Sequence, residues 1–98
     1  TIRQVYTSDR RMLKPLYRAP GSHTWEEKEW DWMLDRIVQR IKETREKSFV
    51  QEENGITVNR TEGIAYLGGA ALDNEENYLI TKLMRTLGIT YLDHQARI

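Results

Sequence analysis

The sequence predicts an α/β fold in which two amphipathic helices cover a small, partly parallel β-sheet. Three features carry this prediction: a helical apolar stripe over about 31–47, a hairpin pattern over about 49–60 and a strand–helix–strand pattern over about 63–92. Strand–helix–strand order is typical of parallel sheets, because a parallel connection needs a crossover. We therefore expect residues 25–98 to form the α/β part and residues 1–24 to form an irregular N-terminal arm.

The expected arm combines helix-breaking residues with an excess of positive charge. Pro15, Pro20 and Gly21 interrupt periodic structure and leave room for one short extended piece at about 16–18. The first 20 residues contain one acidic residue, Asp9, and five basic residues: Arg3, Arg10, Arg11, Lys14 and Arg18. Such an arm suits a phosphate-rich partner, but a run of this kind is more often simply solvated.

The first helix is predicted from six apolar residues that recur at helical spacing along one face: Trp30, Met33, Leu34, Ile37, Val38 and Ile41. Asp31 suits its first turn and Lys47 its last turn, because the helix dipole favours an acid and a base there. Trp30 is expected in the core. Trp32 falls opposite the stripe, so it is either incidentally exposed or part of a surface whose partner is missing.

Turn and capping signals place the remaining elements. Asn54-Gly55 between two short apolar stretches favours a tight hairpin turn, and a buried strand is expected at 63–67. A second helix over about 74–87 begins with a capping-box pattern, Asp73 followed three residues later by Glu76, and ends before Gly88. Its apolar stripe and the strand after it complete the unit: Leu79, Ile80, Leu83, Met84 and Leu87, then Ile89–Leu92.

Composition excludes several classes of function. Fifteen basic and fifteen acidic residues give a net charge of zero, which argues against a general nucleic-acid or anionic-membrane binder. The chain has no cysteine, so no disulfide, thiol nucleophile or cysteine-ligated metal site is expected. Its apolar runs are far shorter than the ~20 residues of a membrane span. We expect neither nucleic-acid binding nor a membrane span.

The glycine-rich turn Gly68-Gly69-Ala70 is the main candidate for ligand binding. Such a turn between a parallel strand and a helix can bind phosphate through backbone N–H groups. However, the stretch matches neither G-x-G-x-x-G nor a P-loop, and Glu75 and Glu76 would repel a phosphate. The residue pattern therefore favours a structural turn.

Acid–base chemistry is not predicted either. The capping box and helix dipole explain the three carboxylates at 73–76. Asp93 and His94 are neighbours in a predicted strand and point to opposite faces, so Asp93 is poorly placed to orient the imidazole. A histidine on the surface or facing a partner is the better interpretation of His94, and no catalytic residue or metal ligand is predicted.

Five stretches carry a likeness to a known family: KPLYRAPGS (14–22), WEEKEW (25–30), NGITVNR (54–60), LGGAALDNEENYL (67–79) and LGITYLDHQARI (87–98). Together they resemble the catalytic (alpha) subunit of formate dehydrogenases in the molybdopterin oxidoreductase family, of the respiratory, selenocysteine-containing type. The resemblance covers nearly the whole chain but only a small early part of that subunit, within a Rossmann-like domain. Lys28 and Glu29 depart from the family's usual apolar–Ser pair, which removes an expected helix cap.

The resemblance implies a parent enzyme that oxidises formate to carbon dioxide. Its cofactors would be molybdenum or tungsten held by bis-molybdopterin guanine dinucleotide, and a [4Fe-4S] cluster. Its partners would be the remainder of the catalytic subunit and an iron–sulfur electron-transfer subunit, in the periplasm. The 98-residue chain alone is expected to be inactive and without cofactor.

The resemblance also assigns residues near the cofactor. The loop 69–74 matches the turn that faces the pterin dinucleotide, so Gly69, Ala70 and Asn74 are expected near it. Gln95 and Arg97 match the motif that leads to the metal-ligating selenocysteine or cysteine, which in the family would follow Ile98. Truncation at a UGA selenocysteine codon is the resulting hypothesis, and a designed domain is its main alternative.

Two other functions stay open from the sequence. One is a fragment of another molybdopterin oxidoreductase, such as a nitrate reductase-like enzyme. The other is a free-standing interaction module derived from one. In each case an exposed strand edge and Trp32 predict self-association of the fragment.

Overall fold

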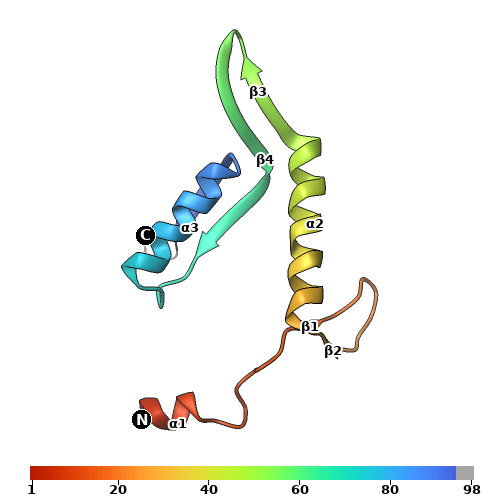
Figure 1. Cartoon of the computed structure of the whole chain (residues 1–98), viewed down its shortest axis with the longest axis vertical. Helices are drawn as coiled ribbons and strands as arrows, with labels where there is room; N and C mark the ends of the chain where they lie inside the picture. The colour runs from red at the N-terminus through yellow and green to blue at the C-terminus, as the bar shows by residue number, and fades with distance from the viewer. Residues whose placement is uncertain (95–98) are drawn as a thin grey trace. The chain divides into compact units, whose positions relative to one another are not determined.

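The computed structural model describes residues 1–94, which divide into two compact units. The first unit is Thr1–Gln39 and the second begins at Arg40. Helix α2, Trp30–Ser48, contributes to both units, and its bounds confirm the helix predicted over about 31–47 (Figure 1). The mixed helix and strand content, with one parallel strand pair, confirms the predicted α/β class.

The first unit contains a short helix where irregular chain was expected. Helix α1 spans Ile2–Tyr6, and its backbone bonds include Val5 N–H to the Thr1 carbonyl at 3.2 Å. A single turn is too short to show an apolar periodicity, which is why the sequence did not reveal it. The predicted extended piece is confirmed as β1, Leu16–Tyr17, which pairs antiparallel with β2, Glu26–Glu27.

Trp32 has a partner within the first unit. Its ring meets the Tyr17 ring edge-on, with centroids 5.0 Å apart, and the Lys28 ammonium lies 4.9 Å from its centroid. Trp32, which lies outside the apolar stripe, thus packs the start of α2 against β1 through its aromatic contact with Tyr17. Its cation–π contact with Lys28 adds a second interaction. Both predictions for Trp32 were incomplete, because the sequence pattern could not show that Tyr17 comes into contact with it.

The second unit is built on a three-stranded sheet in the order β3-β4-β5. Strand β3, Phe49–Glu53, runs antiparallel to β4, Ile56–Gly68, and β4 runs parallel to β5, Ile89–His94. The hairpin turn is Asn54-Gly55, with φ of 52° and 78°, the left-handed pair that a two-residue turn of type I′ requires. The predicted hairpin and parallel unit are therefore confirmed (Figure 1).

Strand β4 differs from the prediction in being continuous. The sequence suggested separate strands at 56–58 and 63–67, whereas one 13-residue strand covers both. Asn59, at φ 44°, and a register shift between Thr61 and Ala65 interrupt the regular pattern inside it. The polar residues between the two apolar stretches mark this irregularity and do not end the strand.

Helix α3, Asn74–Thr86, forms the crossover between β4 and β5. Its C-cap is Leu87, followed by Gly88 at φ 81°, which confirms the predicted C-terminal glycine. A Cβ at position 88 would lie 2.6 Å from the Asn59 carbonyl oxygen, so the close approach also requires glycine. Arg45 of α2 donates from Nε to the Leu87 carbonyl at 2.8 Å and stacks 4.1 Å above the Phe49 ring.

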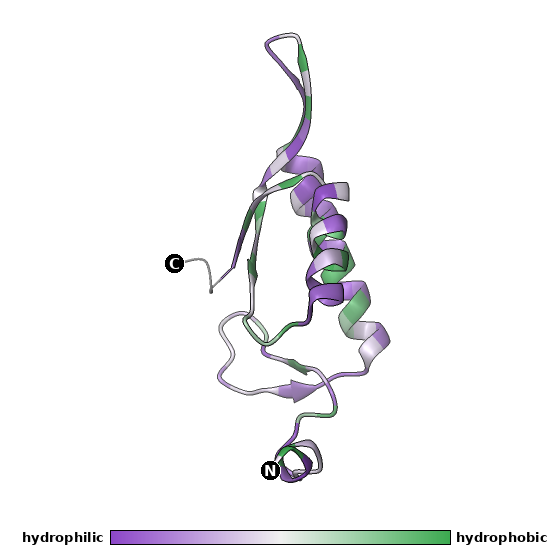
Figure 2. Cartoon of the chain, turned by 90° about the vertical axis from the view of Figure 1, so that its left-hand side faces the viewer, coloured by the Kyte–Doolittle hydropathy of each residue, from purple (hydrophilic) through white to green (hydrophobic). Residues whose placement is uncertain are grey.

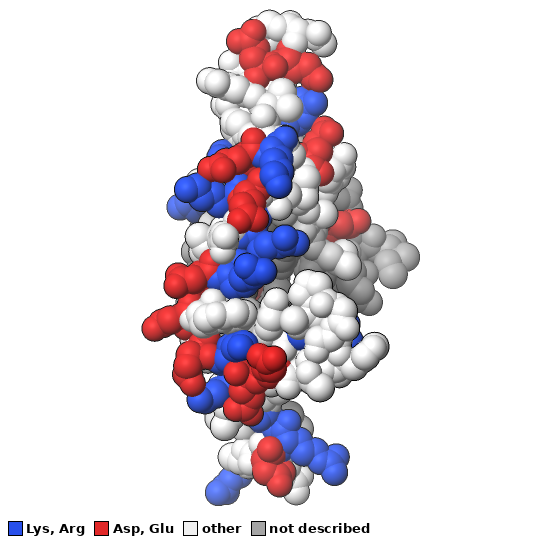
Figure 3. Space-filling view, turned by 90° about the vertical axis from the view of Figure 1, so that its right-hand side faces the viewer, with Lys and Arg blue, Asp and Glu red and all other residues white. Residues whose placement is uncertain are grey.

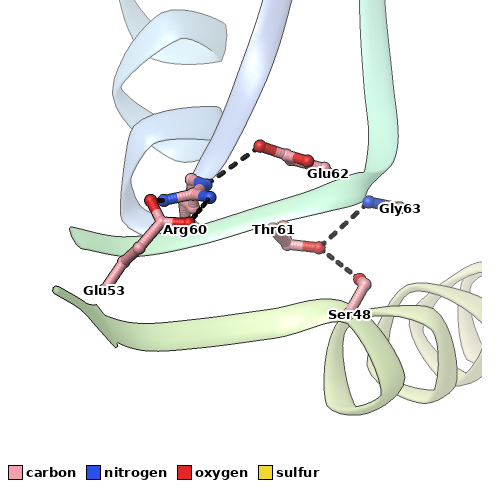
Figure 4. Close-up of polar contacts among 6 residues, drawn as sticks. All are labelled: Ser48, Glu53, Arg60, Thr61, Glu62 and Gly63. Carbon is pink, nitrogen blue, oxygen red and sulfur yellow. Dashed lines mark hydrogen bonds and ion pairs between the residues drawn. The ribbon is translucent and has the colours of Figure 1, made fainter.

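Thr61 is fully buried among the described residues of the second unit and joins three of its segments. Its side chain is fully buried, and its backbone N–H donates to the Gly88 carbonyl at 2.7 Å. Its hydroxyl bonds to the Ser48 hydroxyl at the end of α2 and accepts from the Gly63 N–H (Figure 4). Ser48 donates to the Thr44 carbonyl at 2.7 Å, so Thr61 is the donor in the hydroxyl pair.

A surface charge cluster lies beside this buried threonine. Arg60 forms ion pairs with Glu53 at 2.8 Å and Glu62 at 2.9 Å, tying the two hairpin strands together (Figure 4). The hydrogen bonds from Arg60 lower the pKa of Glu53 below its usual 4.5, and the two acids raise the pKa of Arg60. These groups are solvated, so the cluster adds register specificity more than stability.

Hydrophobic burial is sparse among the described residues. Ile89, at 3% exposure, is the buried hydrophobic residue of this part of the chain. The predicted stripe of α2 is largely exposed, with Trp30 at 58% and Val38 at 62%, so the expectation of Trp30 in a core was wrong. Figure 2 shows hydrophobic and hydrophilic residues alternating along the helices and strands, and Figure 3 shows acidic and basic side chains interspersed on the face in view.

We expect Thr61→Val to destabilise the second unit. The isosteric change removes a buried hydroxyl, so the Gly63 N–H loses its acceptor and the Ser48 oxygen loses its donor, at a cost of about 1–2 kcal/mol. The measurement is the free energy of unfolding in urea. Thr57→Val, the same substitution at an exposed position of β4, is the matched control and should have little effect. Equal stability of the two variants would contradict the role of Thr61.

Candidate functional site

The candidate site is the edge of the sheet where the parallel strands β4 and β5 end. Gly68 pairs with His94 at this edge, and Leu67 pairs with Asp93. Ligands of α/β folds bind beyond the carboxyl ends of parallel strands, where the loop into the next helix lies. Gly69 and Ala70 are exposed in that loop, and Asn74 is the first residue of α3. The structure thus brings three of the five predicted cofactor-facing residues to one edge.

The other two predicted residues, Gln95 and Arg97, lie outside the described residues. They follow His94, the last residue of β5, directly in the sequence. Their proximity to a cofactor stays a prediction.

His94 contacts the glycine turn through its ring. Its Nε2 lies 2.7 Å from the Gly69 carbonyl oxygen, and because a carbonyl only accepts, Nε2 is the donor. Gly68 makes room for the ring, since a Cβ there would lie 2.8 Å from the imidazole Cδ2. The prediction of a surface or partner-facing histidine was therefore incomplete: the ring is bonded within the chain. A glycine inside a strand often marks such a close approach, and this was the available signal in the sequence.

Asp93 also contributes at this edge. Its Oδ1 accepts from the backbone N–H of His94 at 2.8 Å. The Asp93 side chain therefore bonds to the backbone at the end of β5.

The N-terminus of α3 is occupied by its own cap. Asp73 accepts from the Glu76 N–H at 2.8 Å, and Glu76 accepts from the Asp73 N–H at 3.2 Å, as the capping-box prediction required. Asn77 donates from Nδ2 to the Asp73 carbonyl at 2.9 Å. Three carboxylates, including Glu75, therefore surround the position that a phosphate would take. The residues present do not fit a pyrophosphate group bound at this helix terminus.

A small cavity lies next to the ring of His94. It measures about 160 Å³ and lies between β4, α3 and β5, lined by Tyr66, Asn77, Thr81, Leu92, Asp93 and His94. Within residues 1–94, no group of three or more His, Cys, Asp or Glu side chains could hold a metal ion. In the same residues, no helix has the length and apolar character to cross a membrane.

Comparison with known proteins assigns the chain to a class. No protein-family model matches it. It is 53% identical over 96 residues to formate dehydrogenase subunit alpha of Megalodesulfovibrio gigas, which covers 97% of this chain and 10% of that protein. It is 46% identical over 95 residues to formate dehydrogenase 2 subunit alpha (cytochrome c-553) of Nitratidesulfovibrio vulgaris, covering 96% of this chain and 9% of that protein.

A third relative has a lower sequence identity. The formate dehydrogenase-O major subunit of Escherichia coli K12 is 40% identical over 92 residues, covering 93% of this chain and 9% of that protein. The chain is therefore homologous over nearly its whole length to a segment of formate dehydrogenase alpha and major subunits, as the sequence motifs indicated. It spans about a tenth of the length of these relatives.

We expect Asp73→Ala to weaken α3 at the candidate site. Loss of the N-cap acceptor leaves the Glu76 N–H unpaired and should lower the free energy of unfolding by about 1 kcal/mol. Asp73→Asn keeps a side-chain oxygen at the cap and serves as the matched control. Urea unfolding of both variants checks the prediction, and an equal loss in both would show that charge, not the cap, matters here.

Proposed function

We propose that this chain is part of the catalytic subunit of a formate dehydrogenase, which oxidises formate to carbon dioxide. The observation that carries the proposal is the 40–53% identity to three formate dehydrogenase alpha or major subunits over 93–97% of the chain. In this proposal the β4–α3–β5 unit is structural. It supplies a sheet edge, with the turn from Gly69 to Asn74, that lies near the cofactor of the intact subunit.

The cofactor of the intact subunit would be molybdenum or tungsten bound by bis-molybdopterin guanine dinucleotide, with a [4Fe-4S] cluster for electron transfer. When bound, the metal–pterin group supplies the two-electron chemistry and the protein supplies its position. Gly69 and Ala70 suit this role because they expose backbone close to the strand ends. By the resemblance to the family, Gln95 and Arg97, which follow β5 in the sequence, would lie near this group in the intact subunit. The phosphates of this cofactor would bind away from the N-terminus of α3, because its own acidic cap occupies that position.

The proposed partners are the remainder of the same catalytic subunit and an iron–sulfur electron-transfer subunit. The exposed apolar side chains of α2 and α3 support this proposal, because the remainder of the subunit would bury them. Leu34 is 52% exposed on α2, and Leu79 is 62% exposed on α3. In a complete globular domain, an amphipathic helix normally buries its apolar stripe against the core.

A chimeric enzyme tests the proposed function. Residues of this chain replace the matching segment of the Megalodesulfovibrio gigas alpha subunit, and formate-dependent reduction of a viologen dye is measured. We expect activity within roughly one order of magnitude of the parent enzyme, a barrier change of about 1.4 kcal/mol. The matched control carries the same residues in shuffled order and should be inactive.

Two results would contradict the proposal. A folded chimera that contains its metal but does not oxidise formate would exclude a formate dehydrogenase segment. Reduction of nitrate by that chimera would support the nitrate reductase-like alternative.

We also propose that the isolated chain self-associates through its exposed apolar surfaces. Size-exclusion chromatography with light scattering should show oligomers whose fraction rises with concentration. Leu34→Glu/Val38→Glu should shift the chain toward monomer, because two charges then lie on the apolar stripe of α2. Arg40→Glu changes the net charge by the same amount without removing an apolar side chain and is the control. A monomeric wild-type chain at high concentration would refute this proposal.

A further inference from the structure

We propose that His94 is a positioning residue that holds the glycine turn after β4 against the end of β5. This role is distinct from catalysis, because the ring acts on a backbone carbonyl of the chain. Its relevance to formate oxidation rests on the proposed function, whereas the contact itself is a property of this chain.

The first argument is the fit between the ring and the strand pair. His94 and Gly68 are directly paired in the parallel register, and the missing side chain at position 68 leaves the space that the imidazole fills. A Cβ there would approach the ring to 2.8 Å, closer than a carbon–carbon contact allows. Residue 68 is also buried, so the ring covers it. Glycine at 68 and histidine at 94 therefore act as a matched pair.

The second argument is the place of the hydrogen bond. Nε2 of His94 reaches the carbonyl of Gly69, the first residue after β4, at 2.7 Å. At the other end of the turn, the capping box of Asp73 and Glu76 holds the backbone to α3. Gly69 itself has open space around its Cβ position, so packing adds little restraint there. The turn is thus held at its two ends, by His94 on the strand side and by the cap on the helix side.

The third argument is that one residue joins the two segments assigned to the cofactor. The turn from Gly69 to Asn74 follows β4, and Gln95 follows His94 at the end of β5. The contact between His94 and Gly69 fixes the spacing between the start of the turn and the end of β5. In the intact subunit this would hold the turn against the end of β5 before any cofactor binds.

Hydrogen–deuterium exchange of the turn tests the role of His94. His94→Ala should speed exchange in peptides covering 69–74 by roughly two- to tenfold, the range expected for loss of one hydrogen bond. Exchange in β3 and in the first half of β4 should not change and serves as the internal reference. His94→Gln, whose amide can donate to the same carbonyl, should restore part of the protection. His23→Ala removes the other histidine of the chain, which lies in the first unit, and should leave the turn unchanged.

A double-mutant cycle tests the pairing of His94 with Gly68. Gly68→Ala should speed exchange of the turn when His94 is present, because the new methyl displaces the ring. The same substitution should have little effect in the His94→Ala background, where the space is empty. Additive effects, or a turn whose exchange is unchanged by His94→Ala, would overturn the proposal.

The chimeric subunit separates this inference from the proposed function. The same variants are made in the chimera, and both exchange and formate oxidation are measured. Faster exchange of the turn with a several-fold lower kcat, an unchanged KM for formate and partial rescue by His94→Gln supports the full proposal. Faster exchange in a chimera that never oxidises formate leaves His94 as a positioning residue and refutes only the proposed function.

Discussion

The second unit depends on the burial of one threonine. Thr61 occupies the point where the end of α2, the middle of β4 and the turn before β5 meet, and its polar groups bond to all three. Burying a polar side chain is favourable only when its groups are paired, so these partners must be in place together. The middle of β4 is irregular at this point, with Asn59 in a left-handed conformation and a register shift between Thr61 and Ala65.

Polar contacts carry an unusual share of the organisation of this chain. Arg45 joins α2 to the end of α3, and Arg60 joins the hairpin strands, while Ile89 supplies the buried apolar contact. Such contacts specify which segments meet but contribute little free energy by themselves. Several apolar side chains of α2 and α3, such as Leu34 and Leu79, are exposed. This arrangement agrees with homologues about ten times longer than this chain.

The candidate site follows from topology and from one side chain. Parallel pairing of β4 with β5 places the glycine turn and the end of β5 at the same edge, and His94 joins them. The capped and acidic start of α3 makes this edge unlike a phosphate-binding turn. The hydrogen bonds at this edge hold the backbone of the turn in place, and its carboxylates disfavour binding of an anion.

Local signals in the sequence determined the hairpin turn and both ends of α3. Asn54-Gly55 specified the hairpin turn, Asp73 with Glu76 the start of α3, and Gly88 its end, because each depends on residues a few positions apart. The motifs also determined the kinship with formate dehydrogenase subunits. Only the tertiary structure decided that Tyr17 meets Trp32, that Thr61 is buried and that His94 bonds to Gly69. These contacts join residues 13–25 positions apart or depend on strand register, which no local pattern encodes.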